Sequence, residues 1–117
     1  MNGDVWRVVE VEPGDAALVD RTGVARLATT DPATRTVSVA KGLEPPLLDS
    51  VMVHEAAHAA MASYGLLGAL RSHLPRRLWV PTEEWAAQLV EGYGIEAAQA
   101  ASQALGRPVC TRGFCNG

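Results

Sequence analysis

The sequence holds little of what marks membrane proteins and nucleic-acid binders. No apolar run approaches the roughly 20 residues that a helix needs to span a bilayer. The ten basic residues are scattered, apart from Arg71, Arg76 and Arg77, and the formal net charge is −3. Because a nucleic-acid site needs clustered positive charge, we expect neither a membrane nor a nucleic acid as a partner.

Cysteine is also scarce, and the chain begins without the basic start and apolar stretch of a secretory signal. We therefore expect a cytoplasmic protein. The two cysteines, Cys110 and Cys115, have four residues between them. A local disulfide, two free thiols and half of a metal site are all compatible with that spacing, so the sequence leaves their state open.

The composition that is present suits one folded unit. The chain has 117 residues, of which 48% are hydrophobic and 20% are charged. This is enough for one hydrophobic core and too short for two ordinary domains. We expect residues 1–117 to form a single domain.

The first forty residues have the composition of strands. Residues 5–11 are rich in β-branched and aromatic side chains, residues 17–20 are a short apolar run, and residues 23–29 alternate moderately. Residues 31–34 supply a turn, because proline presets its backbone angle and aspartate can bond the backbone beyond it. Residues 36–40 then return as a strand, which predicts a small antiparallel sheet with a hairpin.

From residue 46 onward the pattern becomes helical. Apolar residues and two histidines recur at spacings of three and four, which predicts a helix over about residues 46–63. Residues 71–81 contain two prolines and predict a loop or a short broken helix. A second long helix is expected to begin near Thr82 as its N-cap, with the side of Trp85 and Tyr93 packed inward, and an alanine-rich helix should follow over residues 95–105. The fold class is therefore α+β.

One short motif in the first helix carries chemistry, the segment His54-Glu55-Ala56-Ala57-His58. Residues four apart lie one turn above each other, so both imidazoles can bind one zinc ion. Glu55 lies beside the metal, where it can take a proton from a zinc-bound water whose pKa the metal lowers to about 7. The motif predicts a Zn²⁺ site for peptide-bond hydrolysis, although two such histidines can also be core residues with satisfied hydrogen bonds.

A catalytic zinc site needs a third protein ligand and an open fourth position. His73, the only other histidine, is one candidate. On a helical wheel Glu83 lies at the edge of the apolar face of the second helix, whereas Glu84 points the other way. An inward carboxylate is costly unless a cation meets it, which favours Glu83 as the third ligand. Both glutamates can instead serve as partners of the helix dipole in the first turn.

These groups resemble the gluzincin arrangement, in which a glutamate on a second helix completes the zinc site. Over residues 23–91 the chain is similar to the small ImmA/IrrE-type metallopeptidases and to zincin-like proteins encoded by phages. The second-helix motif of that family is Glu-x-x-Ala-Asn or Glu-x-x-Ala-Asp. Glu83 and Ala86 match its first and fourth positions, but the fifth is Ala87, and a reading from Glu84 matches about as well.

The resemblance implies a minimal zincin-like domain with a zinc-dependent metallopeptidase activity on a peptide or protein substrate. Tyr64, His73 and Tyr93 are candidates to stabilise the oxyanion. The substrate would lie extended beside an edge strand, either residues 36–40 or the hairpin partner of that strand. The competing hypothesis is a non-enzymatic phage structural or assembly protein, located in the virion, that keeps the scaffold with a structural zinc and binds other virion or assembly proteins.

Overall fold

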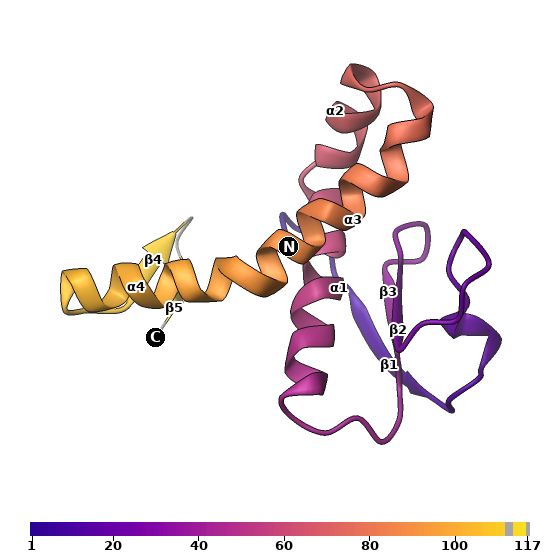
Figure 1. The fold of residues 1–117 in the computed structure, drawn as a ribbon, viewed down its shortest axis with the longest axis horizontal. Coiled ribbons are helices and arrows are strands. Elements are labelled where there is room, and N and C mark those ends of the chain that lie inside the picture. Colours follow the sequence, from indigo (N-terminus) through magenta and orange to yellow (C-terminus); the bar gives the residue numbers. More distant parts are fainter. Residues whose placement is uncertain (112–113, 117) are drawn as a thin grey trace.

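The N-terminal part of the molecule is a three-stranded sheet (Figure 1). The computed structural model describes residues 1–111 and 114–116. The strands are β1 (Arg7–Val11), β2 (Ala28–Asp31) and β3 (Thr36–Ala40), and their order across the sheet is β1-β3-β2. β3 is therefore the central strand, and β2 lies at an edge.

The sheet is mixed, so the prediction of an antiparallel sheet is wrong for β1. β1 runs parallel to β3, whereas β2 and β3 form the expected antiparallel hairpin. A parallel pair needs a crossover connection, and residues 12–27 provide it by carrying the chain past β3 to the far edge. Within that connection the strand predicted at residues 17–20 is a short 3₁₀ turn, η1 (Ala16–Leu18), and only the last two residues of the strand predicted at 23–29 belong to β2.

The core lies between the sheet and the helix α1 (Leu47–Ser63), whose bounds agree with the prediction of 46–63. Ala28, Val37 and Val39 are buried and share one face of the sheet, because alternate residues of a strand point to the same side. On α1, Ala57 and Ala59 are buried. Ala59 lies one turn after Glu55, whose carboxylate contacts Thr30 of β2, so its small side chain faces the sheet.

The second half of the molecule is helical. It contains α2 (Leu66–His73), the 3₁₀ turn η2 (Arg76–Leu78) and α3 (Trp79–Leu89). Residues 71–81 are thus partly helical, and α3 begins before Thr82, which corrects the predicted N-cap. Pro81 is accommodated because it lies in the first turn, where a missing N–H costs no hydrogen bond. No helix of the described residues is both long and apolar enough to cross a membrane.

The inward side of α3 is also not the one predicted. Trp85 and Tyr93 are 61% and 66% exposed, whereas Glu83 and Ala87 are buried. Because α3 starts at Trp79, the two glutamates lie beyond its first turn, and they are not the dipole partners that the sequence allowed. The small side chain of Ala87 and the pairing of Glu83 with a histidine of α1, described below, determine which side of α3 faces the core.

A single π-helical turn, η3 (Val90–Gly94), joins α3 to α4 (Ile95–Leu105), whose bounds confirm the predicted helix. Figure 1 shows α4 projecting away from the sheet and α1. Beyond it, β4 (Val109–Thr111) and β5 (Phe114–Asn116) pair as a short hairpin with Cys110 opposite Cys115 in the register. The side chains of both cysteines lie outside the described part of the structure. The choice between a disulfide, free thiols and a metal site therefore stays a prediction from the sequence.

Candidate metal centre

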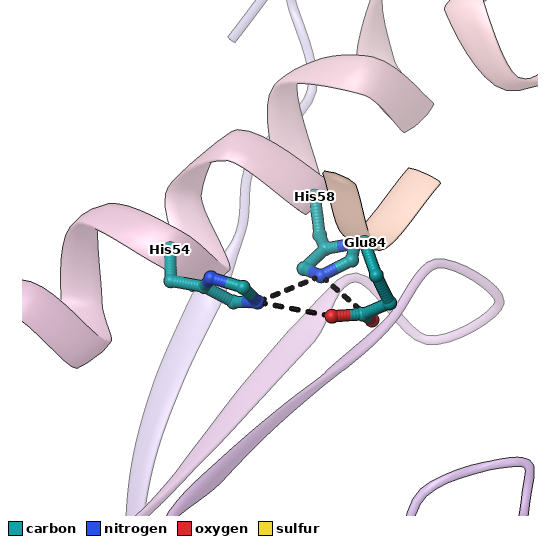
Figure 2. A group of neighbouring side chains, drawn as sticks. All are labelled: His54, His58 and Glu84. Carbon is teal, nitrogen blue, oxygen red and sulfur yellow. Dashed lines mark hydrogen bonds and ion pairs between the residues drawn. The ribbon is translucent and has the colours of Figure 1, made fainter. Parts of the chain in front are cut away.

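α1 and α3 together bring four predicted or candidate ligand residues to one place. His54 and His58 stand one turn apart on α1, and Glu83 and Glu84 are neighbours on α3. Figure 2 shows both imidazoles of α1 turned toward the carboxylate of Glu84. His58 and Glu83 are buried, while His54 and Glu84 are partly exposed.

The ring nitrogens of both histidines and the carboxylate oxygens of Glu84 lie close together. Nε2 of His54 lies 3.3 Å from Nε2 of His58. Oε2 of Glu84 lies 3.3 Å from Nε2 of His54, and Oε1 of Glu84 lies 3.2 Å from Nε2 of His58. In a tetrahedral zinc site with bonds of about 2.0–2.1 Å, the ligand atoms are about 3.3 Å apart. The donor set and its spacing therefore fit a zinc ion with three protein ligands.

Glu83 contacts the opposite side of the His58 ring. Its Oε2 lies 2.5 Å from Nδ1 of His58, and its Oε1 lies 2.9 Å from Nη2 of Arg21. A proton on Nδ1 that is donated to Glu83 leaves Nε2 with a lone pair, which is the tautomer a metal ligand needs. Glu83 thus orients His58 and directs Nε2 toward Glu84.

The charges around His58 affect both partners of this pair. Burial alone would lower the pKa of His58, but the hydrogen bond and charge of Glu83, with the charges of Glu84 and Glu55, outweigh burial and raise it. Burial would likewise raise the pKa of Glu83, but the hydrogen bonds from His58 and Arg21 outweigh burial and lower it. In the absence of a metal the two side chains therefore favour an ion pair.

Glu55 lies next to the metal centre on α1 and is directed toward β2. It is 7% exposed, and its Oε2 accepts a short hydrogen bond from the hydroxyl of Thr30. The bond holds the carboxylate in one orientation. Glu55 thus lines the same cleft as His54 and His58.

These groups line one cleft of about 610 Å³. The loop of residues 19–22, the edge strand β2 and the facing sides of α1 and α3 form its walls. The cleft contains His54, Glu55, His58, Glu83 and Glu84, together with Arg21 and Thr30. Its volume is in the range of sites that bind small molecules or short peptide segments.

The structure does not bring every sequence candidate to this cleft. His73 lies on the exposed surface of α2, with Nδ1 2.8 Å from the carbonyl oxygen of Ala69. Of the residues that the structure describes, neither His73 nor Tyr64 nor Tyr93 lines the cleft. Arg21 and Thr30 are the contributors that sequence reasoning missed, because a lone arginine in a loop and a lone threonine in a strand carry no local pattern.

Comparison of the chain with protein-family models, with curated proteins and with solved structures found no match. The functional assignment below therefore depends on the residues and geometry of the cleft.

Proposed function

We propose that this protein is a zinc-dependent metallopeptidase in which His54, His58 and Glu84 bind the metal and Glu55 is the general base. The observation that supports it most is the cluster of two imidazole nitrogens, 3.3 Å apart, with a different Glu84 oxygen 3.2–3.3 Å from each of them. A buried carboxylate in the same cleft, held by the hydroxyl of Thr30, supplies the base that such a reaction needs. Three protein ligands and an adjacent cleft are typical of catalytic zinc sites.

Within this proposal Glu84 replaces Glu83 as the third ligand. The carboxylate of Glu84 faces Nε2 of both histidines, whereas Glu83 contacts Nδ1 of His58. A histidine ligand commonly donates its other ring N–H to a carboxylate, which fixes the ring and raises its basicity. Glu83 has that position, so we assign it as the orienting carboxylate and not as a ligand.

The chemistry divides between the ion and the chain. When bound, zinc supplies a Lewis acid that activates water and polarises the scissile carbonyl group. Glu55 accepts the proton of the attacking water and later transfers it to the leaving amine. Thr30 keeps the Glu55 carboxylate in position between these two transfers. His54, His58 and Glu84 hold the metal in the cleft.

The edge strand β2 offers a place for an extended substrate. β3, one of the two strands considered from the sequence, is paired on both sides, so its hairpin partner β2 is the suitable one. Ala40 N donates to Leu27 O, and the alternation of an antiparallel pair then turns the backbone groups of Ala28 and Thr30 away from β3. A peptide added at this edge would pass along the cleft.

The alternative is a non-enzymatic phage structural or assembly protein that keeps zinc as a clamp. One observation favours it. α4 has no buried residue and exposes Ile95 and Leu105, and it projects from the molecule as an arm that other assembly proteins could cover (Figure 1). A structural zinc would require four protein ligands. In the described residues the group has three, which favours the metallopeptidase.

One experiment distinguishes the two functions. It compares the purified wild type with the variant Glu55→Gln and the control variant Glu44→Gln. Glu44 is exposed and lies outside the cleft. Zinc stoichiometry is measured first, and cleavage of a mixed peptide library is then followed by mass spectrometry. We expect one zinc in all three proteins, and cleavage that falls by about 10²–10⁴ only in Glu55→Gln. One bound zinc without cleavage by the wild type would reject the metallopeptidase.

A further inference from the structure

Arg21 reaches the candidate metal centre from a part of the chain that is distant in sequence. Its Nη2 lies 2.9 Å from Oε1 of Glu83, which is the oxygen that His58 does not use. The carboxylate of Glu83 is therefore held from both sides and cannot rotate without losing one of two charged partners. Arg26 also lines the cleft, but its guanidinium pairs with Asp20 at 2.8 Å, whereas that of Arg21 pairs with Glu83.

The loop of residues 20–26 that carries Arg21 has a framework of its own. Oδ1 of Asp20 accepts hydrogen bonds from the backbone N–H of Thr22 at 2.8 Å and of Val24 at 3.0 Å. Oδ2 of Asp20 accepts a hydrogen bond from the Nε–H of Arg26 at 2.8 Å. Asp20 thus holds the loop together. Asp20, Arg21, Thr22 and Arg26 line the cleft, so the loop that carries Arg21 also forms part of the wall.

We propose that Arg21 is a positioning residue that couples the docking of loop 20–26 to metal binding. Arg21 fixes Glu83, Glu83 fixes the ring of His58, and Nε2 of His58 is thereby held at the distance from Glu84 that a metal requires. The inference rests on the zinc centre of the proposed function and does not depend on peptide cleavage. Because coupling between two sites is reciprocal, metal binding also strengthens the docking of the loop.

The first test measures zinc affinity by competition with a chelator. Arg21→Met keeps the length of the side chain and removes the charge. Arg35→Met is the matched control, because Arg35 pairs with Asp4 at 3.2 Å and neither residue lines the cleft. Partners of metal ligands contribute about 10–100-fold in affinity, and we expect about 10-fold weaker binding for Arg21→Met. Arg21→Lys should recover part of the loss, since only one N–H of Arg21 contacts Glu83.

The second test measures the reverse effect of zinc on the loop. Hydrogen exchange is followed at the amides of Thr22 and Val24, both of which donate to Asp20. In the wild type, zinc should slow their exchange several-fold. In Arg21→Met the addition of zinc should leave both rates unchanged, because the link between loop and metal is lost.

The outcomes distinguish this inference from the proposed function. Wild-type zinc affinity in Arg21→Met, or an equal loss in Arg35→Met, would overturn the coupling. A wild type that binds zinc, shows the Arg21 effects and cleaves no peptide would support the coupling and reject the peptidase. A wild type that binds no zinc would overturn both.

Discussion

Exchange of Glu83 and Glu84 for glutamine, one at a time, separates the two roles assigned to these carboxylates. Glu84→Gln removes a charged ligand whose two oxygens lie 3.3 Å and 3.2 Å from the two histidine nitrogens. The amide of glutamine has only one oxygen, and its NH₂ group cannot bind a cation. Glu84→Gln should therefore lower zinc affinity more than Glu83→Gln does.

Glu83→Gln should weaken binding without abolishing it. The amide keeps one oxygen, while two donors, Nδ1 of His58 at 2.5 Å and Nη2 of Arg21 at 2.9 Å, need an acceptor there. One of them must face the NH₂ group, so the ring of His58 is less firmly held. The loss of an orienting partner of this kind is about 10–100-fold in metal affinity, or about 1.4–2.8 kcal/mol.

The assay compares the affinities of both variants with that of the wild type by competition with a chelator. Substitution with Co²⁺ adds a second readout, because its visible absorption responds to the number and type of ligands. Glu83→Gln should keep the wild-type absorption bands at saturating Co²⁺, whereas Glu84→Gln should change them. The reverse pattern, with altered bands and the larger loss in Glu83→Gln, would make Glu83 the ligand, as the sequence predicted, and would refute the assignment of Glu84.

Two further predictions concern pH and packing. Zinc must displace the proton of His58, and because Glu83 raises the pKa of His58, zinc affinity should fall about tenfold per pH unit below that raised pKa. In Glu83→Gln the pKa of His58 should be less raised, so zinc affinity should begin to fall at a lower pH than in the wild type. Chelator titrations at a series of pH values measure this difference. Ala87 is fully buried beside α1, so Ala87→Leu should destabilise the protein by about 1–3 kcal/mol and weaken zinc binding. Thermal unfolding and zinc titration measure both effects, and the exposed Ala97→Leu should show neither.

The features that sequence patterns predicted are those fixed by neighbouring residues. Helical periodicity gave α1 almost to the residue, and alanine content with the Gly-Arg-Pro that follows gave α4. The approach of His54 and His58 follows from a spacing of four on any helix. For the same reason the turn after Asp31 was predictable, since the side chain of Asp31 accepts the N–H of Ala33 at 2.9 Å. Each of these features needs only one local segment to form.

The features that were missed depend on contacts between distant segments. Nothing near β1 indicates that it pairs with β3 in parallel, because that choice is made by the path of residues 12–27. The early start of α3 was hidden by Pro81, which reads as a helix breaker unless it falls in a first turn. Arg21 and Glu83 are separated by 62 positions, so their ion pair had no sequence signal.

On the proposed assignment of Glu84 as the ligand, burial is an unsafe guide to metal ligation. Helical-wheel reasoning correctly made Glu83 the more buried carboxylate, and Glu83 is 6% exposed. The side chain of Glu84, at 36% exposure, stands closer to solvent. A catalytic site must leave one coordination position open to substrate, so its ligand atoms belong at the wall of a cleft. A carboxylate that lies deeper than the imidazole contacts Nδ1. From there it can orient the ring, but it cannot reach an ion bound at Nε2 on the opposite side of the ring. In a site of this kind the more exposed of two adjacent carboxylates is therefore the better candidate for a ligand.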